Sequence, residues 1–274
     1  MTQRATRRFS VSTWSLHRRL GRPPIWGPGE RRPDNDKIST GLPLVDLPAE
    51  LAAHGIHTLE ICHFHLPSQD ETYLATLRSA LDSAGVELFS LLVDGGDITG
   101  PQVEERDMAW IKGWLDVAAT LGAGNARIIA GKQPPSADSL ARSRRNLGTL
   151  ADYAKTIGVR VMSENWLDTF STPEAVCTVM DELDGRVGLC VDFGNWRGAT
   201  KYDELAEIFQ YAESCHAKCH SSATGEFERD DFLRCLDLSA KADFQGPYTL
   251  IYDGPNDDEW FGIGQEMEMV RPYL

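Results

Sequence analysis

The sequence predicts a single (β/α)8 barrel, a TIM barrel, over residues 1–274, and three observations predict it. The 274 residues suit one such barrel, which typically needs about 250. Eight short apolar or β-branched runs alternate with longer segments of helical period, which is typical of a parallel sheet covered by helices. No Gly-rich GxGxxG turn follows the first run, so an open doubly wound sheet is the less favoured arrangement.

The eight runs are the expected strands of the barrel. Their apolar character is nearly continuous, which indicates strands that are covered on both faces. No linker or internal repeat divides the chain, so all eight strands belong to one domain. In chain order, the expected strands lie at residues 9–14, 57–62, 86–93, 126–130, 159–163, 187–192, 214–219 and 248–252.

Glycine and proline mark the ends of the expected helices. Gly55, Gly85, Gly122 and Gly158 each stand one to four residues before a strand, where the C-cap of the preceding helix is expected. The segment at 172–174, with the sequence Thr-Pro-Glu, is typical of a helix N-cap followed by a first-turn proline. Both signals support strands that alternate with helices.

Residues 18–42 interrupt this alternation. The stretch is rich in Pro, Gly and Arg and follows the first expected strand, which places it on the catalytic face of a barrel. Loops of this length are usually either functional or disordered. The sequence leaves open whether the loop is a lid over the site or a segment without such a role.

Composition excludes several classes of partner and location. The net charge of −14 disfavours a nucleic-acid partner. No run approaches the ~20 apolar residues of a membrane span, and no signal peptide is recognisable, so a cytoplasmic protein is expected. The six cysteines form no CxxC pair, which argues against disulfides and a zinc ribbon. Whether the chain forms a homo-oligomer is left open.

Polar residues stand at the ends of the expected strands, where the chemistry of a barrel is located. Seven of the eight strands end in or carry an ionisable or amide side chain, which predicts a polar pocket at one mouth. In chain order these residues are His63 and His65, Asp94, Arg127 and Lys132, Glu164 and Asn165, Asp192 and Asn195, His216 and Lys218, and Asp253.

Glu164, Asp192 and His216 are the central set of this pocket. Each follows or interrupts an apolar run, where a polar group is expensive unless it has a partner or a function. Two carboxylates and an imidazole can hold Mn²⁺, Mg²⁺, Co²⁺ or Zn²⁺. The alternative is a charge network in which the two carboxylates pair with Arg127 and Lys218.

From residue 164 onward the sequence resembles the sugar phosphate isomerase/epimerase family of the xylose isomerase-like TIM barrels. The resemblance is carried by ENW…STPE, GLCVDFGNW, CHAKCHSSATGEF and GPYTLIYDGPNDDEWFGI, and more weakly by LEICHFHLPS and ARIIAGKQ. Family members commonly hold one divalent metal with Glu, Asp, His and a second Glu. The matched motifs therefore imply that Glu164, Asp192 and His216 are three of the ligands.

The eighth strand departs from the family pattern. Ile251 stands where the second glutamate is expected, and an isoleucine can neither bind a metal nor move a proton. Asp253 lies two residues on, so on a strand it shares the face of Ile251 at about 6–7 Å further along. We expect Asp253 to be the fourth metal ligand if the strand end bends inward, or to act through a water.

The resemblance implies a metal-assisted isomerase or epimerase for a small sugar, sugar phosphate or cyclitol. Such an enzyme moves a proton alpha to a carbonyl, which needs a base, an acid or second base, and stabilisation of the enediolate. Glu164 is the expected base, and Lys218, His65 or Asp253 takes the second role.

Four further residues are candidates for contact with the substrate. Arg127 either binds a phosphate or carboxylate of the substrate or pairs with Glu164. Trp14 and Trp166 are either apolar walls for a sugar ring or plugs of the core. Asn195 is expected to contact the substrate as well.

Two other functions remain open. A dehydratase acting on a keto-polyol, such as an inosose or dehydroshikimate, needs only one base and one acid. A non-catalytic sugar-binding barrel is the second alternative, because Ile251 weakens the metal site. Abasic-site endonuclease activity, which occurs in the same superfamily, is disfavoured by the negative charge and by the absence of a histidine-rich ligand set.

Overall fold

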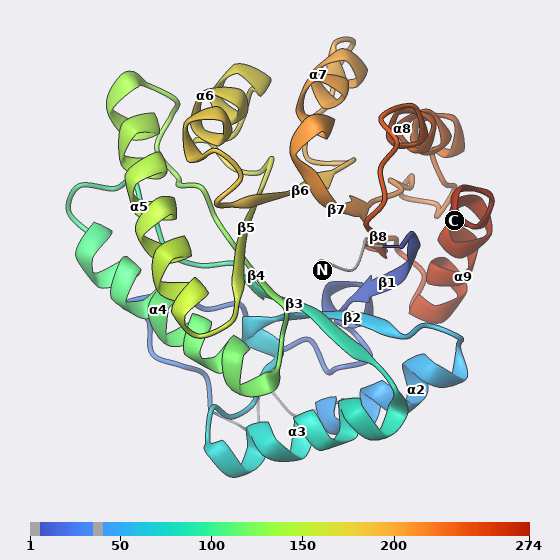
Figure 1. Ribbon diagram of the computed structural model, residues 1–274. Helices are drawn as coiled ribbons and strands as arrows, with labels where there is room; N and C mark the ends of the chain where they lie inside the picture. The colour runs from blue at the N-terminus through green and yellow to red at the C-terminus, as the bar shows by residue number, and fades with distance from the viewer. Residues whose placement is uncertain (1–5, 35–40) are drawn as a thin grey trace.

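Eight parallel strands close into one barrel in the order β1 to β8, so the predicted (β/α)8 fold is confirmed. The computed structural model describes residues 6–34 and 41–274. The part of the 18–42 loop at residues 35–40 and the first five residues of the chain lie outside the described residues. Figure 1 looks along the barrel, with the strands at the centre and the helices around them.

The strands agree with the expected runs to within a few residues at each end. The largest differences are two residues: β1, β4, β7 and β8 stop two residues before the expected runs do, and β7 also begins two residues earlier. The strands are β1 Arg8–Ser12, β2 Thr58–Cys62, β3 Glu87–Val93, β4 Asn125–Ile128, β5 Arg160–Glu164, β6 Gly188–Asp192, β7 Ala212–Ala217 and β8 Pro247–Leu250.

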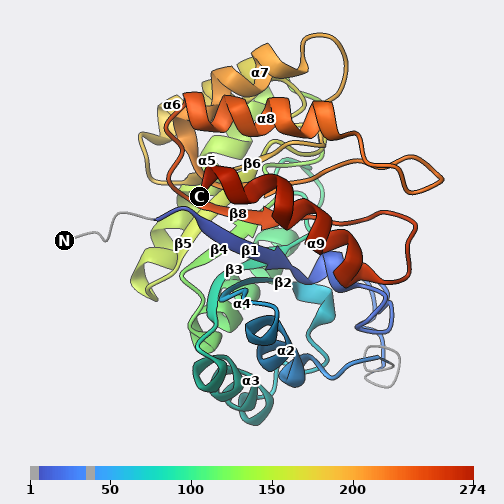
Figure 2. The same ribbon diagram turned by 90° about the vertical axis from the view of Figure 1, so that its right-hand side faces the viewer.

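The helices cover the outside of the barrel, as the second view shows (Figure 2). They are α2 Leu47–Ala53, α3 Glu71–Ala84, α4 Glu104–Leu121, α5 Ala137–Thr156, α6 Pro173–Leu183, α7 Lys201–Ile208, α8 Arg229–Lys241 and α9 Glu259–Val270. None of the helices in the described residues is long and apolar enough to cross a membrane.

The expected caps are present. Gly85 and Gly122 end α3 and α4 with φ of 63° and 78°, a left-handed backbone that glycine adopts without steric cost. The Thr172 side chain accepts a hydrogen bond from the Ala175 N–H at the start of α6, with Pro173 in the first turn. The six cysteines are all free.

The strand register brings the predicted ligands to the same mouth of the barrel. Asp192 lies directly opposite His216 on the neighbouring strand, and Glu164 lies opposite Cys190, two residues before Asp192. Paired residues on parallel strands share a face and every second residue returns to it. Glu164, Asp192 and His216 therefore all project into the barrel at its C-terminal end.

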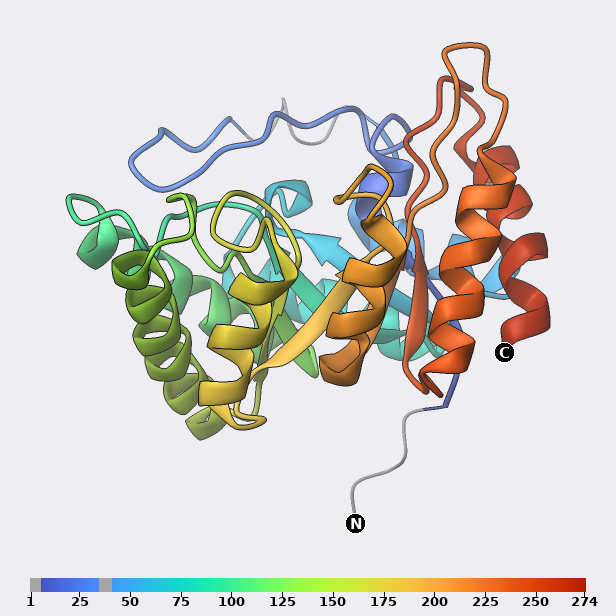
Figure 3. The same cartoon turned by 90° about the horizontal axis from the view of Figure 1, so that it is seen from above.

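The loops that follow the strands gather on one side of the molecule. In Figure 3 the segment after β1, drawn in blue, runs along this side above the strand ends. The described part of the 18–42 loop therefore lies on the catalytic face, as expected.

Gly131, which follows the end of β4, lies in a tightly packed place, and its substitution tests this packing. Its φ is 143°, and a Cβ there would lie 2.3 Å from Thr99 Oγ1 and 2.6 Å from Thr169 Oγ1. We expect Gly131→Ala to lower the free energy of unfolding by about 2 kcal/mol or more, measured by denaturant titration. Gly113→Ala in α4 is the control, because its Cβ meets open space and should gain up to about 1 kcal/mol. Equal stabilities of the two variants would contradict the prediction.

Candidate active site

A cavity of about 610 Å³ opens at the C-terminal mouth of the barrel. Each of the eight strands contributes a lining residue from its C-terminal end or directly after it. The residues predicted from the sequence that line this cavity are Trp14, Asp94, Arg127, Lys132, Glu164, Trp166, Asp192, Asn195, His216 and Lys218. His65 and Asp253 are absent from the described residues that line it.

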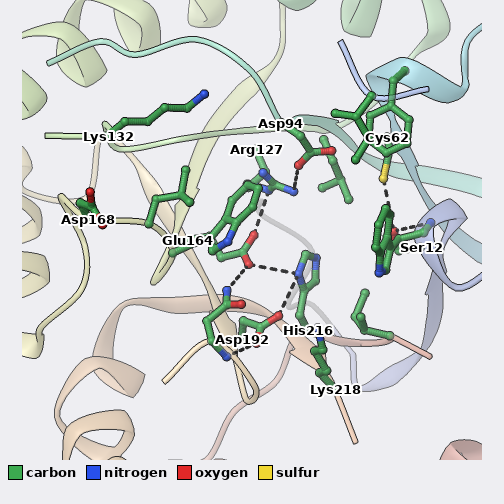
Figure 4. Close-up of a pocket in the computed structure, with 18 residues that line it drawn as sticks. Ser12, Cys62, Asp94, Arg127, Lys132, Glu164, Asp168, Asp192, His216 and Lys218 are labelled. Carbon is green, nitrogen blue, oxygen red and sulfur yellow. Dashed lines mark hydrogen bonds and ion pairs between the residues drawn. The ribbon is translucent and has the colours of Figure 1, made fainter. Parts of the chain in front are cut away.

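Glu164, Asp192 and His216 come together at the floor of the cavity. His216 Nδ1 lies 3.6 Å from Glu164 Oε1 and 3.6 Å from Asp192 Oδ2. Their side chains are only 4–5% exposed. Figure 4 shows the three side chains turned toward one another, and His216 Nδ1 is the atom that lies near one oxygen of each carboxylate.

The other atom of each group is held by the protein. Glu164 Oε2 lies 3.0 Å from Arg127 Nε, and Asp192 Oδ1 accepts hydrogen bonds from the backbone N–H groups of Gly194 and Asn195 at 2.6 and 2.8 Å. These contacts fix the orientation of both carboxylates. The predicted substrate contact Asn195 also donates from Nδ2 to Glu164 Oε1 at 2.7 Å.

The third ligand candidate, His216, is oriented by a residue that the sequence analysis did not single out. Glu60, in the middle of β2, is 1% exposed, and its Oε2 lies 2.8 Å from His216 Nε2. A proton on Nε2 donates to this carboxylate. The lone pair of Nδ1 then faces Glu164 and Asp192 and is left for a ligand. Glu60 could have been noticed as a charged residue inside an apolar strand, LEIC.

The floor carries an excess of negative charge. Glu60, Asp94, Glu164 and Asp192 have side chains between 1 and 12% exposed, and Arg127, at 5%, is the guanidinium among them. Burial by itself would raise the pKa of Glu164, but Arg127 and His216 outweigh it and hold that pKa below its usual value. Glu164 is therefore an ionised carboxylate at neutral pH.

The pKa of His216 moves in the opposite direction. Burial by itself would lower it, but the surrounding acidic groups, Glu164 and Glu60 among them, raise the pKa well above its ordinary value. In the absence of another cation, the ring is expected to carry its own proton on Nδ1 as well. Cys190, which lies within 4.8 Å of both Glu164 and His216, stays a neutral thiol because burial raises its pKa.

Lys218 and Asp253 pair with each other beside this floor. Their charged atoms are 2.7 Å apart. The assigned strand β8 ends at Leu250, and Asp253 is absent from the described residues that line the cavity, so its expected role as a metal ligand stays a prediction. Ile251 lines the cavity at 5% exposed, so an apolar side chain closes the site on the side of β8.

His63 and His65 lie behind the cavity wall. β2 ends at Cys62, and both residues lie on the 3-10 turn His63–His65 that follows it. His65 is 3% exposed and contacts Thr13 Oγ1 at 2.8 Å and His17 Nδ1 at 2.9 Å. Its contacts within the described structure are thus with the turn after β1.

Arg127 and Trp166 lie together on one side of the cavity, and Trp14 follows β1, four strands away from β5 in the closed barrel. The Arg127 guanidinium lies over the Trp166 ring, 5.2 Å from its centroid, and Arg127 Nη2 is 2.6 Å from Asp94 Oδ1. Arg127 Nε also lies 3.0 Å from Glu164 Oε2, so the alternative in which Arg127 pairs with Glu164 is observed. Trp14 lines the cavity next to Phe64, with which it makes an edge contact at 6.3 Å.

The chain matches the model of a known family. A family model described as xylose isomerase-like TIM barrel matches residues 48–267. The chain belongs to this family. The xylose isomerase-like fold thus covers most of the described barrel, and the resemblance inferred from the C-terminal motifs is confirmed.

Relatives within this fold carry several activities. A Streptomyces coelicolor protein provisionally named hydroxypyruvate isomerase is 30% identical over 257 residues, covering 81% of this chain and 89% of that protein. The structure of a D-allulose 3-epimerase from Methylomonas sp. matches with a TM-score of 0.71 at 16% identity over 100% of both chains. A xylose isomerase-like protein from Mycobacterium smegmatis in complex with magnesium matches with a TM-score of 0.67 at 15% identity over 97% of this chain and 96% of that one.

The charge of His216 can be measured directly. In protein freed of metal with a chelator, we expect the His216 ring to remain protonated at pH 7.5, observed by NMR titration. Glu60→Gln should lower the pKa of His216, because it removes one of the carboxylates that raise it. The stabilisation from the charged ring is complete below the unfolded-state pKa of about 6.5 and is lost as pH rises through the folded pKa. A His216 ring that is neutral at pH 6.5 in the wild type would contradict this account.

Proposed function

We propose that this protein is a metal-assisted isomerase that moves a proton next to the carbonyl of a small sugar-like hydroxy-carbonyl compound. The observation that carries the proposal is the common orientation of Glu164 Oε1, Asp192 Oδ2 and His216 Nδ1. The second atom of each group already has a protein partner. Glu164 Oε1 also accepts from Asn195 Nδ2, but a carboxylate oxygen has a second lone pair for a ligand. A curated relative that is 30% identical to this chain is also named an isomerase of a hydroxy-carbonyl compound.

The residues present fit a divalent cation. Two carboxylate oxygens and an imidazole nitrogen are ligands that Mn²⁺, Mg²⁺, Co²⁺ or Zn²⁺ accept. The excess of buried carboxylate around Arg127 is costly unless a cation balances it. Glu164, Asp192 and His216 would hold the ion, and Ile251 would leave the side of β8 without a protein ligand. When bound, the ion would supply charge stabilisation for the enediolate.

Glu164 is the proposed base. Its carboxylate lines the cavity, is ionised, and is fixed by Arg127 and Asn195, so it can accept a proton from a carbon held above the floor. Arg127 keeps the carboxylate in place and adds positive charge at that side of the cavity. The low pKa of Glu164 makes it a weak base, so the reaction depends on acidification of the substrate proton by its carbonyl.

Lys218 is the proposed acid. Its ammonium lines the cavity and pairs with Asp253. Burial by itself would lower the pKa of Lys218, but Asp192 and Asp253 outweigh it and raise that pKa. The side chain therefore stays charged and can donate a hydrogen bond or a proton to a substrate oxygen. We assign Asp253 the role of orienting Lys218.

Ile251 favours isomerisation over epimerisation. An epimerase needs proton donors or acceptors on both faces of the substrate carbon, whereas a single base can carry a proton from one carbon to the next on one face. The apolar side chain at Ile251 supplies neither on the side of β8. A dehydratase remains the second candidate, because Glu164 and Lys218 provide the one base and one acid that the loss of water requires.

A substrate panel tests the reaction class. The purified protein with Mn²⁺ is incubated in D2O with hydroxypyruvate, ketohexoses, inososes and dehydroshikimate, and NMR follows the products. The proposal expects isomerised product in which part of the migrating hydrogen is retained, because one base carries it. Formation of an unsaturated product would favour the dehydratase. Absence of turnover and of metal binding would leave the sugar-binding alternative.

Glu164→Gln removes the proposed base while keeping the shape of the side chain. We expect turnover to fall by at least about 1,000-fold, measured on the panel substrate with the highest rate. The circular dichroism spectrum should remain that of the folded barrel. Turnover within tenfold of the wild type would remove Glu164 from the mechanism.

Ile251→Glu tests the proposed metal position by adding a ligand instead of removing one. A glutamate here adds a carboxylate to a set that lacks its fourth ligand, so we expect Mn²⁺ to bind about tenfold more tightly or better, measured by isothermal titration calorimetry. Ile251→Gln is the matched control, because it has the same length without the charge and should gain much less. Unchanged affinity in Ile251→Glu would argue against a cation between Glu164, Asp192 and His216.

A further inference from the structure

The segment after β1 places an apolar side chain over the cavity. Ile25 lines the cavity, although it is 57% exposed. The next residue, Trp26, turns the other way and is 8% exposed. An exposed isoleucine beside a buried tryptophan indicates that Trp26 anchors the segment while Ile25 remains available to a bound molecule. In Figure 3 this segment passes above the mouth of the barrel.

Trp26 is seated in a slot of aromatic rings. Its ring centroid lies 5.6 Å from that of His63 and 5.8 Å from those of Trp110 and Trp114. The Trp26 carbonyl lies 2.8 Å from His63 Nε2. Aromatic contacts of this kind add to the apolar area that a tryptophan buries, so the slot is the main attachment of this part of the segment.

A second attachment lies six residues further along. Arg32 Nη2 donates to the Leu66 carbonyl at 3.0 Å, and the Arg32 guanidinium lies 5.9 Å from the Trp26 ring. The described part of the segment is thus held at two points against the turn that follows β2.

His63 contacts the active site with its other nitrogen. Nδ1 accepts a hydrogen bond from the backbone N–H of Asp94 at 3.2 Å, and the residue is 0% exposed. A neutral ring with its proton on Nε2 satisfies both contacts, since Nε2 then donates and Nδ1 accepts. Burial lowers the pKa of His63, which keeps the ring in this form.

The contacts continue from Asp94 to the proposed base. Asp94 Oδ1 lies 2.6 Å from Arg127 Nη2, and Arg127 Nε lies 3.0 Å from Glu164 Oε2. The ion pairs among these three side chains are seen in Figure 4. A continuous line of polar contacts therefore runs from the Trp26 carbonyl through His63, Asp94 and Arg127 to Glu164.

We propose that His63 is a positioning residue that holds the Ile25–Trp26 segment over the cavity with one nitrogen and fixes the Asp94–Arg127–Glu164 ion pairs with the other. The segment then covers the cavity in a fixed position, and Ile25 is its contact to the substrate. Its kinetic consequence rests on the proposed function, but the structural coupling does not.

Two isosteric substitutions separate the two contacts. The amide oxygen of Asn occupies the place of Nδ1, so His63→Asn keeps the acceptor for Asp94 and loses the donor to Trp26. The amide nitrogen of Gln occupies the place of Nε2, so His63→Gln keeps the donor to Trp26 and loses the acceptor for Asp94. His63→Phe, which loses both contacts and keeps an aromatic ring in the slot, is the control for packing.

Two readouts do not depend on turnover. Trypsin cleavage after Arg31 reports the seating of the segment, and we expect it to be about tenfold faster in His63→Asn and His63→Phe than in the wild type and His63→Gln, as loss of one buried hydrogen bond allows. The bond after Arg32 precedes Pro33 and is resistant to trypsin. Hydrogen exchange at Arg127 Nε–H, followed by NMR, reports the ion pair. It should be faster in His63→Gln and His63→Phe than in the wild type and His63→Asn.

The kinetic arm uses the panel substrate with the highest rate. His63→Asn should raise KM several-fold at nearly unchanged kcat, because Ile25 is no longer held in place. His63→Gln should lower kcat about tenfold at nearly unchanged KM, because Glu164 is less well fixed.

The outcomes separate the two proposals. Identical behaviour of His63→Asn and His63→Gln in proteolysis and in Arg127 exchange would overturn the role of His63, whatever the activity. If the wild type turns over no panel compound while the two variants still divide as expected, the proposed function fails and the coupling through His63 stands.

Discussion

The excess of buried carboxylate around His216 is the constraint on which the site depends. Four buried carboxylates lie in the mouth of the barrel, those of Glu60, Asp94, Glu164 and Asp192. Arg127 is the guanidinium among them and pairs with Asp94 and Glu164. Buried charges of one sign persist only when partners hold each of them. The structure meets this requirement by giving each ligand candidate a protein partner on one atom and Glu164 a second one through Asn195. His216 Nδ1 lies 3.6 Å from the other oxygen of each carboxylate.

The barrel supplies this arrangement because each strand end delivers its side chain to the same rim. The early end of β8 changes what the rim contains: Ile251 faces the cavity and Asp253 turns to Lys218. The site therefore has a charged half and an apolar half. That division is the physical reason for assigning one base and one acid to the reaction, and it distinguishes this chain from the family pattern of four ligands.

The strand ends were predictable because apolar runs, glycine caps and barrel topology are read locally, and they correctly placed Glu164, Asp192 and His216 at one rim. The same reasoning does not reach His63, His65 and Asp253, because the assigned strand ends before each of them, at Cys62 or Leu250. Glu60 was missed because a charged residue inside a strand has no local signature of its partner.

By itself, then, the sequence determined the barrel, its family and the three residues that converge, since these follow from periodicity, spacing and motifs within short segments. Only the tertiary structure decided which protein group holds each atom of these residues. That depends on side chains remote in the chain, such as Glu60 and His216, which are 156 positions apart, and no local pattern encodes the distance between two such atoms.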